Sequence, residues 1–109
     1  MAIEEAHDRV GRQVKPSTIT DGRKVVAAAA TAEALSSTRL GVSYIIITAE
    51  TNNTGVVAVG ASTVVAAEAT RLGIPLNAGD SLSLGAVNLA DVYLDVTVSG
   101  DGVTYLYLT

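Results

Sequence analysis

Polar and apolar residues alternate along much of the chain after residue 23, and this period of two predicts β-strands. Segment 92–98 (VYLDVTV) is the clearest case, because every second residue is Val or Leu. Side chains on a strand point alternately to its two faces, so this strand would have one apolar face, while Tyr93, Asp95 and Thr97 occupy the other. Segment 81–84 (SLSL) alternates in the same way, and segment 103–108 (VTYLYL) places Val103, Tyr105 and Tyr107 on one face and Thr104, Leu106 and Leu108 on the other. All three are predicted to be half-buried strands.

A second kind of pattern is the unbroken apolar run. Segment 42–50 (VSYIIITAE) is β-branched and aromatic, which predicts a buried strand. The turn residues at 51–55 (TNNTG) and the apolar segment 56–60 (VVAVG) follow it, so we expect the two strands to form a hairpin. The turn at 99–102 (SGDG) predicts another hairpin near the end of the chain.

Two segments are ambiguous. The alanines of 24–35 (KVVAAAATAEAL) favour a helix, whereas its valines and its later alternation favour a strand. We choose a strand, because turn residues bound the segment on both sides. Segment 62–72 (STVVAAEATRL) predicts a short strand followed by a loop or one helical turn.

Short strands separated by turn residues define an all-β fold. We expect a single antiparallel β-sandwich or jelly-roll-like barrel of about seven or eight short strands. Residues 1–22 differ from the rest, since they carry much of the charge and only a loose helical spacing of apolar residues. The prediction is therefore an extended N-terminal arm over 1–22, which becomes ordered on a partner, and a β-sandwich domain over 23–109.

The composition indicates that this domain packs against other protein subunits. Hydrophobic residues make up 49% of the chain, yet there is no Phe or Trp and there are only four Tyr. Small aliphatic side chains bury little area each, so we expect further burial against other subunits. Tyr93, Tyr105 and Tyr107 are candidate partner-binding residues. Packing within the domain is the plainer interpretation of tyrosines on strands, and a sugar-stacking face that includes Tyr44 is a further alternative.

The net charge of −4, with 7 basic and 11 acidic residues, argues against nucleic-acid binding, because no basic stripe with stacking aromatics is present. Arg9, Arg12 and Lys15 cluster in the arm and are candidate contacts to an acidic partner; a solvated arm is the plainer interpretation. The chain has no cysteine, which excludes disulfides and thiolate metal sites. Without a secretory signal or an apolar run of about 20 residues, we expect no membrane contact and synthesis in a cytoplasm.

The search for chemistry predicts no catalytic residue, no cofactor and no metal. His7 is the single histidine and lies in the arm, where nothing would orient it as a base. Asp80 and Asp101 stand beside glycines, where aspartate favours turns, and the GDG at 100–102 lacks the acidic spacing of a calcium loop. No phosphate-binding glycine loop occurs. The chain is expected to be non-enzymatic.

Four motifs carry a resemblance: YIIITA with NTGVVAVG (44–60), GIPLNAGDSLSL (73–84), NLADVY (88–93) and GDGVTY (100–105). In this outline, which covers 42–108, the chain resembles small virion structural proteins of tailed bacteriophages. Segment 66–72 departs from the outline. The resemblance implies a capsid decoration (cement) subunit, found in the virion and made in the host cytoplasm, that stabilises the phage head through contacts with the major capsid protein or other virion proteins.

The same resemblance implies a homo-oligomer, and a trimer would suit a three-fold position on a capsid. A head–tail, collar or spike-base subunit that forms a ring is one alternative. A carbohydrate-binding β-sandwich for host adhesion is another, and it predicts glycan binding that Tyr93→Ala abolishes.

Overall fold

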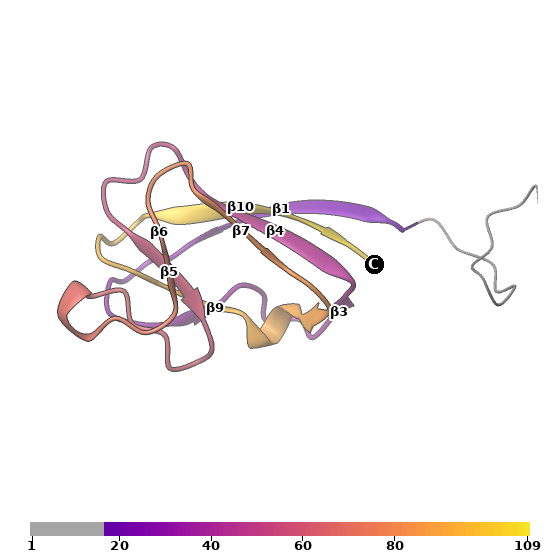
Figure 1. Cartoon of the computed structure of the whole chain (residues 1–109), viewed down its shortest axis with the longest axis horizontal. Coiled ribbons are helices and arrows are strands. Elements are labelled where there is room, and N and C mark those ends of the chain that lie inside the picture. Colours follow the sequence, from indigo (N-terminus) through magenta and orange to yellow (C-terminus); the bar gives the residue numbers. More distant parts are fainter. Residues whose placement is uncertain (1–16) are drawn as a thin grey trace, which may run out of the picture.

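The structure, a computed structural model, describes residues 17–109 as an all-β sandwich, which confirms the predicted fold class (Figure 1). Two four-stranded antiparallel sheets face each other, with strand orders β1-β10-β4-β7 and β2-β9-β5-β6. A third sheet pairs the short strands β3 and β8. The strands are, in chain order, β1 Ile19–Val25, β2 Glu33–Ala34, β3 Gly41–Val42, β4 Tyr44–Ala49, β5 Val57–Gly60, β6 Ile74–Leu76, β7 Ser81–Leu84, β8 Val87–Asn88, β9 Tyr93–Val96 and β10 Gly102–Leu108. Two short 3-10 helices, η1 Glu68–Thr70 and η2 Leu89–Asp91, lie in the connections.

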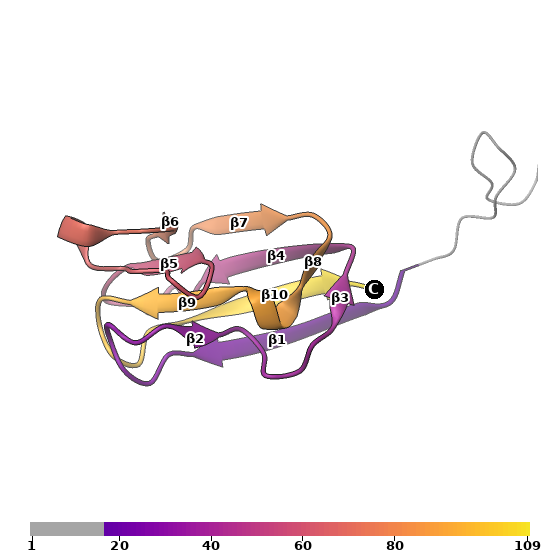
Figure 2. The same cartoon turned by 90° about the horizontal axis from the view of Figure 1, so that it is seen from below.

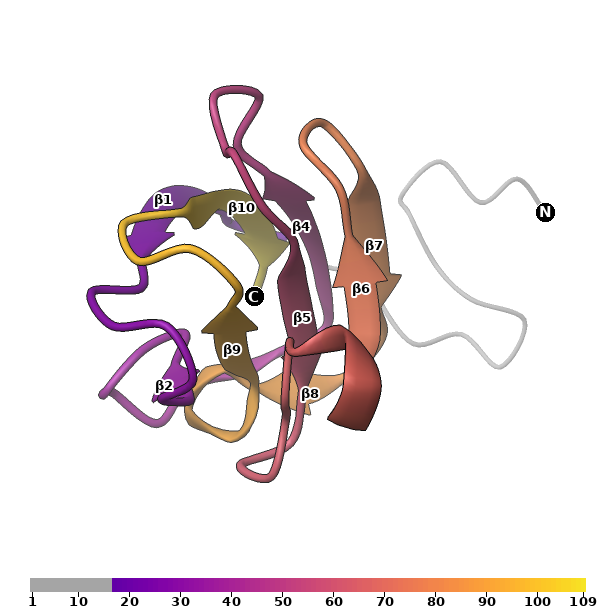
Figure 3. The same cartoon turned by 90° about the vertical axis from the view of Figure 1, so that its left-hand side faces the viewer.

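The strand pairs are nested in the sequence. β1 pairs with β10, β2 with β9, β3 with β8, β4 with β7 and β5 with β6, all antiparallel. This is one long hairpin folded over on itself, which is the topology of a jelly roll. Two more pairings, β10 with β4 and β5 with β9, complete the two sheets. Figures 2 and 3 show the result: β1 and β2 lie along one side of the sandwich, and β6 and β7 lie along the other.

Both expected hairpins are wrong, because in each case the two strands belong to different sheets. β4 pairs with β10 and β7, whereas β5 pairs with β9 and β6. β9 and β10 are separated in the same way. Their connections are instead tied to each other: Asn53 exchanges two side-chain hydrogen bonds with the backbone of Gly102, at 2.9 and 3.0 Å. Turn residues show where the chain reverses, but not which strand it meets afterwards.

Segment 24–35 is not one strand, contrary to the prediction. β1 ends at Val25 and β2 comprises only Glu33 and Ala34, with a turn between them in which Ala30 has a φ of 64°. The chain must turn here because it crosses from one sheet to the other.

The arm also ends earlier than expected. β1 begins at Ile19, so residues 19–22, which the sequence placed in the arm, pair with the end of β10. Residues 17–109 hold ten strands instead of about seven or eight, since β2, β3 and β8 have only two residues each.

The main core lies between the two sheets. Its fully buried side chains come from β4, β5, β9, β10 and the residue that follows β1, and the largest are Ile45, Ile47, Leu94, Val26, Val57, Val96 and Val103. The burial of Val92, Leu94 and Val96 confirms the apolar face predicted for 92–98 as far as Val96, whereas Val98 lies beyond β9 and is 40% exposed. A second, smaller core of Ala58, Val64 and Ala66 lies on the outer side of the β2-β9-β5-β6 sheet. The segment 61–73 forms its roof. The helical turn predicted within 62–72 is present as η1, but the predicted short strand is reduced to an isolated bridge between Val65 and Leu72.

Candidate functional site

The outward side of the β1-β10-β4-β7 sheet carries apolar side chains that remain in contact with solvent. We call this surface, formed by Ile19, Tyr44, Ile46, Leu106 and Leu108, the open face. Leu106 lies directly opposite Ile46, and Leu108 lies between Ile19 and Tyr44. Directly opposite side chains on one face are in contact distance, so these five residues form one patch across three strands. Ile19 is 66% exposed and Leu106 is 39% exposed.

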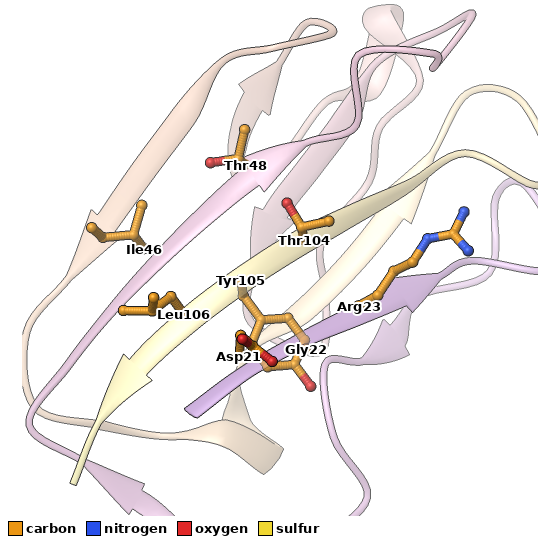
Figure 4. Close-up of a pocket in the computed structure, with 8 residues that line it drawn as sticks. All are labelled: Asp21, Gly22, Arg23, Ile46, Thr48, Thr104, Tyr105 and Leu106. Carbon is orange, nitrogen blue, oxygen red and sulfur yellow. The ribbon is translucent and has the colours of Figure 1, made fainter. Parts of the chain in front are cut away.

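A wide hollow of about 620 Å³ lies on the open face (Figure 4). Ile46 and Leu106, which lie opposite each other, form its apolar part. The next pair of opposite residues on the same face, Thr48 and Thr104, forms its polar part. β1 contributes Asp21, Gly22 and Arg23 at the rim, and Tyr105 completes the lining. Figure 4 shows that Ile46, Thr48, Thr104 and Leu106 project from neighbouring strands β4 and β10. The hollow thus combines an apolar floor with hydroxyl groups and one charge of each sign.

Two of the polar side chains that line this hollow, Arg23 and Thr48, have hydrogen-bond partners. The guanidinium of Arg23 donates two hydrogen bonds to the carboxylate of Glu50, Nη2 to Oε1 at 3.2 Å and Nε to Oε2. This hydrogen bonding, together with the charge attraction, raises the pKa of Arg23 above its ordinary value. The hydroxyls of Thr48 and Ser81 are 2.7 Å apart. Such an arrangement can bury apolar surface and present a fixed cation; the residues that line it include no histidine or cysteine.

The tyrosines proposed from the sequence do not share one surface. Tyr105 and Tyr107 are partly buried against the main core, with their rings stacked at a centroid distance of 6.1 Å. Tyr93 packs against the small core on the other sheet, and Tyr44 lies on the open face with 38% exposure. Among them, only Tyr44 belongs to the patch described above. The candidate contacts Arg9, Arg12 and Lys15, and the single histidine, His7, lie outside the described residues.

The carboxylates serve local structure at separate places. Asp101 accepts hydrogen bonds from the amides of Thr54 and Gly55, and Asp80 accepts one from the amide of Asn77, as expected for turn residues. Asp91 forms an ion pair with Arg39, which holds the pKa of Asp91 below its usual value. Asp95 is buried, and its Oδ2 accepts from the amide of Ala66 at 2.8 Å. No three His, Asp or Glu side chains within 17–109 gather closely enough to hold a metal ion.

Sequence reasoning missed Ile46 and Leu106 as surface residues. A usable signal was present, because Ile45, Ile46 and Ile47 form a continuous run instead of an alternation. A strand that is apolar on both faces is typical of a sheet covered on both sides. In the described structure only one side of β4 is covered, so the run marks a surface that lacks its cover.

The comparisons with known proteins identify no relative. No family model matches the chain, and no curated protein or solved structure is significantly similar to it. The resemblance to phage virion proteins therefore stays a prediction. Over residues 17–109, no helix is long and apolar enough to span a membrane.

Proposed function

We propose that this chain is a non-enzymatic virion structural protein, a capsid decoration subunit that stabilises a phage head through protein–protein contacts. The open face is the surface that would bind the major capsid protein. The proposal combines the motif resemblance between 42 and 108 with the physical character of this face.

The observation that carries the proposal is the apolar patch on an otherwise well-packed sheet. Ile19, Tyr44 and Leu106 expose large apolar side chains side by side, and contiguous apolar patches on soluble proteins commonly mark interaction sites. The rim adds Asp21 and the paired Arg23, so the patch has an apolar centre and a charged margin. Protein–protein interfaces have this layout.

The test is cosedimentation of the purified chain with heads of the phage that encodes it, prepared from a mutant that lacks this gene. We expect binding that saturates at a fixed ratio to the capsid subunits and raises the temperature at which the heads rupture. Leu106→Asp would place a charge in the centre of the open face and should abolish binding.

Leu72→Asp is the matched control. Leu72 is also an exposed leucine, but it lies on the roof segment of the other sheet, so this variant should bind like the wild type. Absence of binding to heads, or equal loss of binding in both variants, would refute the proposed role of the open face. Binding confined to the portal end of the head would instead favour the ring-forming subunit.

Carbohydrate binding is the second candidate, and one observation favours it. The hollow carries hydroxyl, carboxylate and guanidinium groups from Thr48, Thr104, Asp21 and Arg23, next to the exposed ring of Tyr44 on the same face. Sugar recognition uses such polar groups with an aromatic platform. A glycan array decides between the two functions: specific binding that Tyr44→Ala abolishes would favour adhesion, whereas an array without signal would remove this candidate.

A further inference from the structure

Within residues 17–109, the outer edge of β1 is the longest strand edge without a pairing partner. The edge strands of the two main sheets are β1 and β7 in one, and β2 and β6 in the other. β7 has four residues, β2 has two, and β6 has three, of which Pro75 lacks an N–H group. Short edges and proline discourage pairing with another chain. β1 has seven residues and no proline, so it has neither of these protections.

The backbone groups that β1 presents at this edge follow from its register. Thr18 and Thr109 exchange both backbone hydrogen bonds, at 3.2 and 3.0 Å, so they form a hydrogen-bonded pair. Such pairs alternate along an antiparallel ladder, and residues 20, 22 and 24 therefore bond to β10. The N–H and C=O groups of Ile19, Asp21, Arg23 and Val25 point the other way. No hydrogen bond within 17–109 is recorded for them on that side.

The side chains of two copies of β1 are complementary when the two strands run antiparallel to each other. We propose that two copies of this chain pair through their β1 edges, antiparallel, about a twofold axis that passes beside Gly22. In this register Ile19 lies opposite Val25 of the second copy, and Asp21 lies opposite Arg23 of the second copy. Each of these contacts occurs twice because the interface is symmetric. All four residues are those whose backbone groups face the free edge, so the ladder and the side-chain pairs agree.

The charges also select this register over its neighbours. Hydrogen bonding at the edge requires odd-numbered residues to face odd-numbered residues, so the pairing can shift only in steps that keep this parity. The next register in one direction places Arg23 opposite Arg23 of the second copy, and the next in the other direction places Asp21 opposite Asp21. Like charges directly opposite each other destabilise a strand pair, whereas opposite charges stabilise it. Of these three registers, only the one centred on Gly22 both forms the backbone hydrogen bonds and places opposite charges next to each other.

The pairing also explains two exposed apolar side chains at the two ends of β1. Ile19 is 66% exposed and Val25 is 37% exposed, and each would contact the other across the axis. At the centre, the ring of Tyr105 fills the space over Gly22 on the core side, because a Cβ there would come within 2.4 Å of the ring. The product is one continuous sheet of eight strands that carries both open faces side by side. This inference does not depend on the proposed function.

The first test is the mass of the full chain by light scattering over a concentration series. We expect a reversible dimer. Asp21→Arg places two arginines opposite each other in the homodimer, and Arg23→Asp places two aspartates opposite each other, so each variant alone should dimerise at least about tenfold more weakly. An equimolar mixture of the two variants should restore the dimer, since every charged pair in the heterodimer is then of opposite sign. Recovery on mixing also shows that both variants are folded.

Glu68→Arg is the control, because it makes the same change in charge on η1, away from the β1 edge, and should leave the dimer unchanged. Cysteine cross-linking provides an independent test, since the chain has no other cysteine. Thr20 and Lys24 of the second copy form a pair without hydrogen bonds in this register, which is close enough for a disulfide. The Thr20→Cys, Lys24→Cys double variant should give a covalent dimer, and Thr20→Cys alone should not. A wild-type chain that stays monomeric up to about 1 mM, a trimer, or a dimer that both charge variants leave intact would overturn the proposal.

Discussion

The two main sheets have four strands each, but they differ in whether another segment of the chain covers their outer side. On the β2-β9-β5-β6 sheet, the roof segment 61–73 lies over Ala58 and Asp95, and it contributes Val64 and Ala66 to a second small core. On the β1-β10-β4-β7 sheet, Leu106 and Ile46 have no such roof within the described residues, and the open face results.

The difference follows from the lengths of the connections. The chain between β5 and β6 spans 61–73, which is long enough to fold back over the sheet. No two strands of the β1-β10-β4-β7 sheet are consecutive in the chain, so each connection from them leads to a strand of another sheet. One sheet is therefore completed by its own chain, whereas the other exposes apolar surface that a partner could cover. If the open face is a binding surface, its side chains should be dispensable for the fold.

The largest effect is expected from two neighbouring isoleucines of β4 that point to opposite sides. Ile47 is fully buried in the main core, whereas Ile46 lies on the open face. Ile47→Ala should lower the free energy of unfolding by about 2–5 kcal/mol, because it removes core contacts and leaves a cavity. Ile46→Ala should cost much less, about 1 kcal/mol or below. Urea denaturation of both variants measures the difference; equal losses would show that the open face is part of the folding core.

A smaller effect is expected at the point where the roof segment returns to the sheet. Gly73 has a φ of 101°, and a Cβ on it would lie 2.7 Å from the carbonyl oxygen of Val59. Gly73→Ala should therefore destabilise the protein by about 1–3 kcal/mol. Gly85→Ala is the control, since a Cβ at Gly85 would meet nothing within 4 Å. If thermal unfolding shows the same stability for both variants, the roof does not depend on this close approach.

The smallest effect concerns the side of the sandwich where β1 and β2 meet. The carboxylate of Glu33 accepts hydrogen bonds from the ammonium of Lys24 and from the amide of Ala27, both at 3.0 Å. The hydrogen bond from Lys24 is the main cause that lowers the pKa of Glu33. A carboxyl group whose pKa is lower in the folded state stabilises the fold above its unfolded pKa, and that stabilisation is lost as the pH falls through the folded pKa.

Glu33→Gln should thus be less stable than the wild type at pH 7, by about 1 kcal/mol or less, because the pair is near the surface. The two proteins should converge as the pH falls below about 4, the ordinary range for glutamate. Urea midpoints measured at pH 7 and pH 3 follow this convergence. A constant difference between the two pH values would mean that the ion pair does not contribute.

Local patterns predicted much of the secondary structure. The spacing of apolar residues in 81–84, 92–98 and 103–108 predicted β7, β9 and β10, because a strand that contributes to the core needs an apolar face whatever it pairs with. The same patterns failed to predict features that depend on contacts between distant segments. Both expected hairpins were wrong, and the burial of Asp95 under the roof could not be anticipated from its polar side chain.

The sequence by itself determined the all-β class, the positions of most turns and the inward face of β9, since these depend on the propensities and spacing of nearby residues. Only the tertiary structure decided which strands are neighbours, which of two apolar faces is covered, and that β1 is an edge. Those properties depend on contacts between residues far apart in the chain, such as Ile19 with Leu108, and no local pattern contains them. The self-complementary order of charges in β1 was present in the sequence throughout, but it acquires meaning only because the fold leaves that strand unpaired on one side.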